Sequence, residues 1–144
     1  MRRKQKNLRP KVFFNASVIL AGLKSPKGGS GKLISLAGEK KIRGFISEIV
    51  FDEVKSHAGK VGFSRFEIKS EVDKTMLIGK YPPRLKTKYR RLVKDEGDIH
   101  LFTSSEQLGV DYLVSLDKKH VLALSGKIRG FKIVSPGELL KLLE

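Results

Sequence analysis

The chain has 144 residues, contains no cysteine, and carries 30 lysines and arginines against 15 aspartates and glutamates, a net charge of +15. This length suits one globular domain, and the lack of cysteine excludes disulfides and cysteine-ligated zinc. No apolar run approaches the roughly 20 residues that cross a bilayer, so we expect a soluble, cytoplasmic protein with no membrane partner, and the excess positive charge favours polyanions.

The predicted elements alternate between strands and helices. A strand at residues 12–14 precedes helices at 17–23 and 32–37. A second strand at 41–47 precedes helices at 48–58 and 64–78. A helix at 98–109 then precedes strands at 111–117 and 131–135 and a last helix at 136–144. This alternation predicts an α/β fold with a parallel sheet covered on both faces. We assign residues 11–144 to one domain and residues 1–10 to a basic arm, of the kind that is often mobile.

Residues 25–31, SPKGGSG, lead into Lys32 in a pattern similar to a phosphate-binding loop. That motif would require glycine at Pro26 and serine or threonine at Leu33, and it would follow a strand. Here the segment joins two predicted helices. We therefore do not assign phosphate binding to it.

The segment at residues 74–94 contains no acid and interleaves tyrosines with cations. Tyr81 and Tyr89 would stack on bases while the cations contact phosphates, a mixture suited to single strands. The alternative is a solvated basic loop. The predicted nucleic-acid-binding residues are Lys80, Arg84, Lys86, Lys88, Arg90 and Arg91.

Polar residues occur at strand ends and on one buried helix face. Asn15 follows the first strand, and Asp117 ends the strand at 111–117. On the helix at 48–58, a period of about 100° per residue places Glu53 between Ile49 and Val50, on the face expected to meet the core. The alternatives are a turn residue for Asp117 and a buried ion pair for Glu53.

Asp98 opens the helix at 98–109, where it could simply act as an N-cap. Together with Asn15, Glu53 and Asp117, it would lie at the carboxyl edge of the sheet, where functional groups of such folds collect. Clustered carboxylates require a cation, and with only three histidines we expect oxygen ligation of Mg²⁺ or Mn²⁺. Such a site within a basic surface is typical of phosphodiester hydrolysis.

These residues resemble the PIN-domain family, particularly the stand-alone prokaryotic members that act as toxins of toxin–antitoxin pairs. The resemblance rests on VFFNASVILAGL with Asn15 and Ser17, ISEIVFDEV with Glu53, DIHLFTSSEQLG with Asp98, and YLVSLD with Ser115 and Asp117. It implies a three-layer α/β/α fold with a five-stranded parallel sheet of order 3-2-1-4-5. It also implies a Mg²⁺ or Mn²⁺ site and ribonuclease activity on single-stranded RNA. The expected catalytic and metal-binding residues are Asn15, Glu53, Asp98 and Asp117, supported by Ser17 and Ser115.

The sequence departs from the family at Asn15, where the resemblance implies an aspartate. An amide coordinates a cation more weakly than a carboxylate, so we expect a greatly reduced or absent nuclease rate. The first hypothesis is therefore an attenuated metal-dependent endoribonuclease. The alternatives are a non-catalytic RNA-binding or antitoxin-binding protein, and a homodimeric toxin that an antitoxin segment holds inactive. The RNA target and the natural or engineered origin of Asn15 stay open.

Overall fold

A computed structural model describes residues 9–79, 87–93 and 96–144. Five parallel strands form one sheet in the order β3-β2-β1-β4-β5, which confirms the predicted topology. The strands are β1 (Lys11–Phe14), β2 (Arg43–Ser47), β3 (Met76–Gly79), β4 (Tyr112–Val114) and β5 (Lys132–Val134). In the described part of the chain, no helix is long and apolar enough to cross a membrane.

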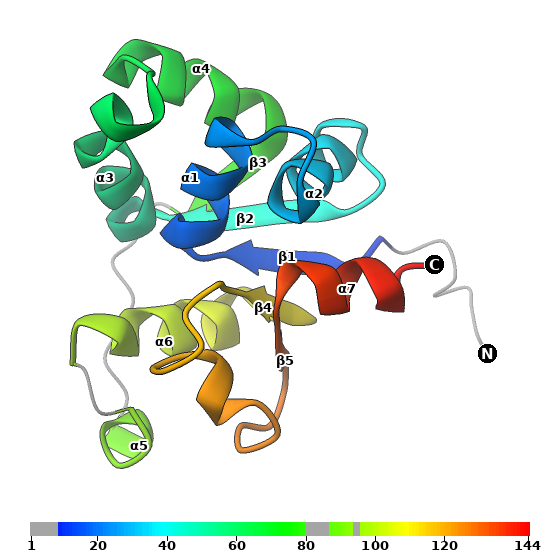
Figure 1. Cartoon of the computed structure of the whole chain (residues 1–144). Helices are drawn as coiled ribbons and strands as arrows, with labels where there is room; N and C mark the ends of the chain where they lie inside the picture. The colour runs from blue at the N-terminus through cyan, green and yellow to red at the C-terminus, as the bar shows by residue number, and fades with distance from the viewer. Residues whose placement is uncertain (1–8, 80–86, 94–95) are drawn as a thin grey trace.

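Helices cover both faces of the sheet, which gives the predicted three layers (Figure 1). One face carries α1 (Ala16–Lys24), α2 (Gly29–Gly38), α3 (Glu48–Ser56) and α4 (Arg65–Thr75), and α7 (Pro136–Leu142) packs against α2. The other face carries α5 (Thr87–Arg90), α6 (Ile99–Leu108) and the segment between β4 and β5. Short 3₁₀ turns lie at Ala58–Val61, Glu96–Asp98 and Leu122–Leu124.

The central strand explains the first apolar run of the sequence. Val12, Phe13 and Phe14 of β1 are completely buried, because β1 pairs with β2 on one side and β4 on the other and helices cover both of its faces. A strand covered on both faces is apolar along nearly all of its length, and the lysine of β1, Lys11, stands at its start. The chain turns polar at Asn15, where it leaves the sheet.

The strand β3 was not predicted from the residue pattern, which indicated only the other four strands of the sheet. The sequence indicated one helix at 64–78, but α4 ends at Thr75 and Met76 to Gly79 form β3, parallel to β2. Ser64 and Glu67 form the capping box that starts the helix. Pairing with β2 overrides helical propensity in the last turn, since a short apolar run such as MLIG fits either structure.

The glycine-rich segment joins α1 to α2 as expected, although α2 begins at Gly29, three residues earlier than predicted. A Cβ at Gly31 would lie 2.1 Å from the Pro26 carbonyl oxygen, and a Cβ at Gly22 would lie 2.4 Å from Ile34 Cδ1. Gly22 therefore lets α1 lie close to α2, and Gly31 leaves room for the carbonyl group of the Pro26 turn. These two close contacts explain the glycines without phosphate binding.

Candidate metal centre

The candidate site lies at the carboxyl edge of the sheet. Phe14 pairs with Val114 in the register of β1 and β4, so that Asn15 and Ser115, which follow them, leave adjacent strands side by side. The two residues are 100 positions apart in the sequence. Asp117 lies two residues beyond Ser115 in the turn after β4.

Asn15 is nearly buried, with 8% of its surface exposed, and it is the N-cap of α1. Its Oδ1 accepts a hydrogen bond from the Ala16 N–H at 2.8 Å, and its Nδ2 donates to Ser115 Oγ at 2.9 Å. Ser115 Oγ also accepts the N–H of Asp117 at 3.0 Å. Ser115 therefore connects Asn15 to the turn that carries Asp117.

Ser17 holds the same turn from the other side. Its Oγ accepts the N–H of Leu116 at 3.2 Å, while Ser115 Oγ accepts that of Asp117. The two serines that the sequence singled out thus bond to successive backbone N–H groups after β4. Together they fix the direction in which Asp117 leaves the sheet.

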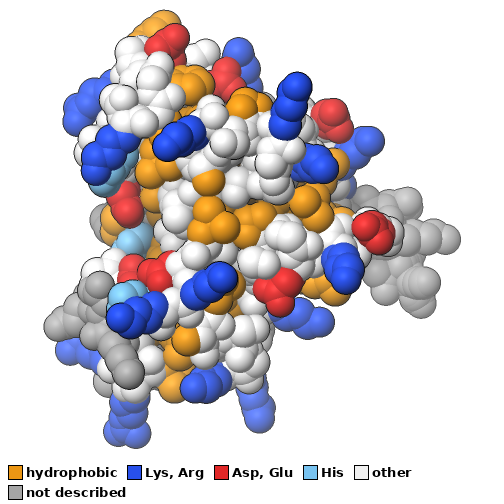
Figure 2. All heavy atoms as spheres, in the orientation of Figure 1, with side chains coloured by type: hydrophobic (Ala, Val, Ile, Leu, Met, Phe, Trp, Pro, Cys, Tyr) orange, Lys and Arg blue, Asp and Glu red, His pale blue; other side chains and the backbone are white. Residues whose placement is uncertain are grey.

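Asp98, Asp117 and His120 bring one ligand atom each within 4.8 Å of one another. Asp117 Oδ1 accepts the N–H groups of Lys119 at 3.1 Å and His120 at 2.9 Å, and Asp117 Oδ2 lies 3.4 Å from His120 Nδ1. All three side chains are half-buried. In Figure 2, acidic and histidine side chains gather at the left edge of the molecule, between the parts that contain α3 and α6.

Asp98 occupies the N-cap position of α6, yet its side chain makes no capping hydrogen bond. N-capping, the structural role that the sequence suggested for Asp98, therefore does not explain this aspartate. His100, the second residue of α6, is 9% exposed, and its Nδ1 has no hydrogen-bond partner among the described residues. Burial lowers the pKa of His100, which favours the neutral imidazole.

The family model described as PIN domain matches residues 11–119. This chain belongs to the PIN-domain family. No curated protein sequence matches it.

A solved structure has the same fold as this PIN domain. The crystal structure of VapBC2 from Rickettsia felis, bound to a DNA fragment from its promoter, matches with a TM-score of 0.60. The match covers 87% of this chain and 98% of the other, with 14% sequence identity. At that identity the likeness concerns the fold.

The donor atoms of this PIN domain fit a divalent cation. Two carboxylates and an imidazole within 4.8 Å of one another form a mixed oxygen and nitrogen set. Such a set suits Mn²⁺ better than Mg²⁺, because Mg²⁺ strongly prefers oxygen. The expectation of oxygen-only ligation did not include His120, whose imidazole lies within 4.8 Å of the two carboxylates. The sequence signal for His120 is its position three residues after Asp117, because the turn at the aspartate brings the two side chains together.

Glu53 is exposed on α3, so its expected placement on the buried face is wrong. The core-facing residues are Val50, Phe51 and Val54, whereas Ile49 is 39% exposed. Phe51 extends the buried arc away from Ile49, and Glu53 falls on the Ile49 side. Glu53 is not a member of the group formed by Asp98, Asp117 and His120. Its place on a helix that follows β2 still puts it at the carboxyl edge of the sheet.

The predicted nucleic-acid-binding segment is described only in part. Lys80, Arg84 and Lys86 lie outside the described residues, as do Tyr81 and the side chain of Lys88. Arg90 and Arg91 are exposed, as phosphate contacts require. These six residues remain a prediction.

Tyr89 belongs to the core, so the expectation that it stacks on bases is wrong. Only 1% of its surface is exposed, and its ring lies 5.8 Å from that of Phe102, between centroids. The phenol donates a hydrogen bond to Glu106 Oε1 at 2.5 Å. Burial, followed by the hydrogen bond and the charge of Glu106, raises the pKa of Tyr89.

Replacing Tyr89 with phenylalanine is expected to lower the free energy of unfolding at neutral pH by about 1–2 kcal/mol, the value of a hydrogen bond to a partly exposed carboxylate. Above the ordinary tyrosine pKa of 10.0, residue 89 ionises in the unfolded chain before it does so in the folded one, so this contribution falls as pH rises. Urea unfolding of both proteins at neutral pH and at about pH 11 measures the difference. Equal stabilities at neutral pH would contradict the assignment.

Proposed function

We propose that this PIN domain is a metal-dependent endoribonuclease that acts on single-stranded RNA and that Asn15 strongly reduces its rate. The proposal rests on one observation above all. Asp98, Asp117 and His120 come within 4.8 Å of one another at the carboxyl edge of the sheet, in a chain of net charge +15. Side chains that can bind a metal cation, on a surface that is otherwise positively charged, suit an enzyme that hydrolyses phosphodiesters.

The residues of the site have separate tasks in this proposal. Asp98, Asp117 and His120 would hold the cation, with Glu53 approaching from α3 and Asn15 as a weak fifth ligand. The bound ion supplies a water of lowered pKa and neutralises charge on the phosphate. Lys118 and Lys119 are exposed beside Asp117, where their charges would hold the RNA backbone. Ser17 and Ser115 would keep Asp117 in place.

Asn15 supports the expected loss of rate. Its Oδ1 already accepts the Ala16 N–H, and its Nδ2 presents hydrogens where an aspartate would present a second oxygen. The site also has one negative charge fewer than a site with aspartate there. Both effects weaken binding of a divalent cation.

The second candidate is a non-catalytic protein that binds RNA or an antitoxin. It is favoured because Asn15 is explained by structure alone, as the N-cap of α1 and the donor to Ser115. The similar VapBC2 structure is a complex bound to DNA, which supports an antitoxin partner for this chain as well. In this alternative the chain would act through that complex, as a monomer or as a homodimer.

Incubation with an unstructured RNA and Mn²⁺ is the direct test. We expect slow internal cleavage that EDTA abolishes, and less cleavage in Mg²⁺ than in Mn²⁺. Asp98→Asn and Asp117→Asn are each expected to remove most of this activity, roughly 10²-fold. Gel analysis of end-labelled RNA measures cleavage, and titration calorimetry measures Mn²⁺ binding.

Asp52→Asn is the matched control, because Asp52 is exposed on α3 and lies 3.5 Å from Lys55 as an ordinary surface ion pair. It should leave cleavage unchanged. If Asp98→Asn and Asp117→Asn retained the cleavage and the Mn²⁺ affinity of the parent protein, the observed nuclease would be a contaminant and the proposed site wrong.

A further inference from the structure

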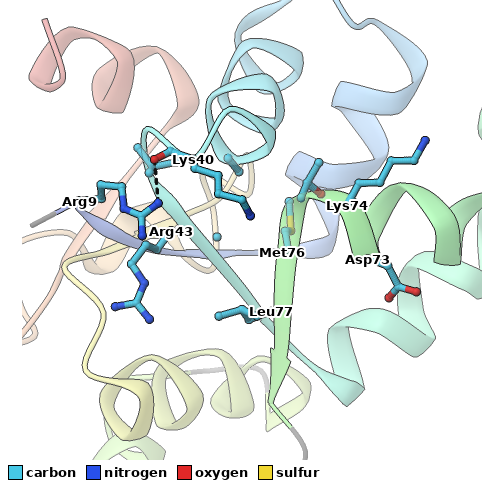
Figure 3. Close-up of a pocket in the computed structure, with 11 residues that line it drawn as sticks. Arg9, Lys40, Arg43, Asp73, Lys74, Met76 and Leu77 are labelled. Carbon is cyan, nitrogen blue, oxygen red and sulfur yellow. Dashed lines mark hydrogen bonds between the residues drawn. The ribbon is translucent and has the colours of Figure 1, made fainter.

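A cavity lined by charged and apolar side chains lies at the amino ends of β2 and β3 (Figure 3). This edge of the sheet is opposite to the edge with the candidate metal centre. Its volume is about 150 Å³, and its floor includes Gly44 at the start of β2 and Met76 at the start of β3. The four residues of β1 separate the two edges by about 13 Å. One phosphodiester group therefore cannot contact both sites.

Three cations from separate segments border this cavity. Arg9 precedes β1, Lys40 lies in the turn between α2 and β2, and Arg43 begins β2. Figure 3 shows them on one side of Met76, with Asp73 and Lys74 on the other. We call the cavity bordered by Arg9, Lys40 and Arg43 the amino-edge pocket.

The two arginines of the amino-edge pocket are held in place, one by a backbone carbonyl and the other by an aromatic ring. The Arg9 Nη1 donates to the Lys40 carbonyl oxygen at 3.0 Å, and Lys40 has a left-handed backbone with φ of 62°. The Arg43 guanidinium lies 5.4 Å from the centroid of the Phe45 ring, an attractive cation–π contact. These contacts position the two guanidinium groups without neutralising them, and the Lys40 side chain is exposed.

Acids do not balance this charge. Asp73, the acid that lines the pocket, pairs with Lys69 at 2.8 Å, and Lys74 pairs with Glu71 at 3.6 Å. Within residues 9–79, 87–93 and 96–144, Arg9, Lys40 and Arg43 have no acidic partner within 4.0 Å. Three unbalanced cations close together repel one another, and an anion in the pocket would relieve that repulsion.

We propose that the amino-edge pocket binds a backbone phosphate of a single-stranded nucleic acid. Guanidinium groups match the planar arrangement of phosphate oxygens, and two arginines with a lysine can contact one phosphate from several sides. A nucleic acid is favoured over an acidic peptide, because every unit of its backbone carries a charge and the chain as a whole has a charge of +15. Since phosphate contacts carry no sequence information, the pocket should bind RNA and DNA strands alike.

The test compares two doubly substituted proteins of equal charge. Lys40→Asn with Arg43→Gln removes two cations of the pocket, and asparagine tolerates the left-handed backbone at position 40. Lys60→Asn with Arg65→Gln removes two exposed cations elsewhere, after α3 and at the start of α4. Fluorescence anisotropy with short unstructured RNA and DNA probes is measured in EDTA, so that metal binding and cleavage play no part.

We expect the pocket variant to bind both probes about tenfold more weakly, and the slope of log affinity against log salt to become shallower by about 0.7. The control pair should change affinity much less. Equal losses in the two variants, or no loss in the pocket variant, would overturn the proposal. So would a loss confined to a glutamate-rich peptide used as a third probe.

A second measurement uses the unsubstituted protein, so that misfolding of a variant cannot decide the outcome. Titration of the ¹⁵N-labelled chain with the DNA probe in EDTA should shift the amide resonances of Arg43, Gly44 and Leu77. Shifts confined to the carboxyl edge of the sheet, near Ser115 and Asp117, would contradict the pocket and leave the nuclease proposal intact.

Discussion

Asn15→Asp is expected to raise the rate of RNA cleavage in Mn²⁺ by roughly 10²-fold or more, the scale of one well-placed electrostatic group. In the proposed site, the aspartate would add a charge and an oxygen ligand to those of Asp98 and Asp117. It also preserves the local hydrogen bonds, because the Ser115 hydroxyl can donate to a carboxylate where it now accepts from the Asn15 amide. The same change should tighten Mn²⁺ binding, which titration calorimetry measures independently of cleavage.

The stability of the Asn15→Asp protein provides a second readout. Without metal, the new carboxylate is nearly buried close to other acids, so we expect the free energy of unfolding to fall by about 1–3 kcal/mol. Saturating Mn²⁺ should restore that stability, since a ligand that binds only the folded state stabilises it. Thermal unfolding with and without Mn²⁺ measures both effects.

The double variant Asn15→Asp with Asp98→Asn serves as the control. It has the net charge of the parent chain, but its added acid stands in a site that has lost another ligand. It should show neither the gain in rate nor the metal-dependent stabilisation. If Asn15→Asp itself bound Mn²⁺ no better and cleaved no RNA, while the strand still bound, the non-catalytic alternative would be correct.

Gly31→Ala is expected to destabilise the fold by about 3 kcal/mol or more, at or above the upper end for overpacked positions. An added Cβ would lie 2.1 Å from the oxygen, 2.5 Å from the carbon and 2.6 Å from the Cα of Pro26. All three are backbone or ring-bearing atoms of a turn, so a rotamer change cannot relieve the contact. Relief would require the turn at Pro26 to move away from the first turn of α2.

Gly29→Ala is the matched control two residues earlier in the same helix. Its Cβ would make ordinary contacts at 3.6 Å with Pro136 Cβ and 3.7 Å with Leu140 Cδ1. Alanine should therefore leave the stability unchanged or raise it by about 0.5–1 kcal/mol through its higher helix propensity. Urea unfolding of the two variants compares them directly. Equal stabilities would show that the close approach of the Pro26 backbone does not explain Gly31.

The GGSGK segment is similar to a phosphate-binding loop, yet Gly31 is explained by its close contact with the Pro26 backbone. Phosphate contacts are instead proposed for cations that no short motif identifies. Lys118 and Lys119 follow Asp117, and a second group borders the amino-edge pocket. The six cations predicted between residues 80 and 91 form a third group.

Much of the fold was predictable because the apolar runs are distinct. Residues 12–14 and 111–117 identified the central strands, and their alternation with helices implied a parallel sheet. The strand β3 was missed because its apolar residues continue directly from α4 without a turn signal. The burial of Glu53 was also misjudged, since the helical period gives relative angles but not which side of the helix meets the core.

The candidate site was predictable to a similar degree. Asn15, Asp98 and Asp117 stand at strand ends and at a helix start, positions that local patterns reveal. Ser115 bonds to Asn15 only because β1 and β4 are neighbours in register. His120 lies beside the carboxylates only because of the turn at Asp117. Tyr89 does not belong to the proposed RNA surface, because its phenol donates a hydrogen bond to Glu106 inside the domain.

The sequence by itself determined the α/β class, the excess of cations, and the asparagine that ends the first strand. These properties depend on composition and on neighbours within a few residues. Tertiary structure alone decided which acids share a site, which tyrosine is buried, and which cations meet at the amino edge of the sheet. The physical reason is that such groupings depend on strand order and register, which bring together residues as far apart as Asn15 and Ser115.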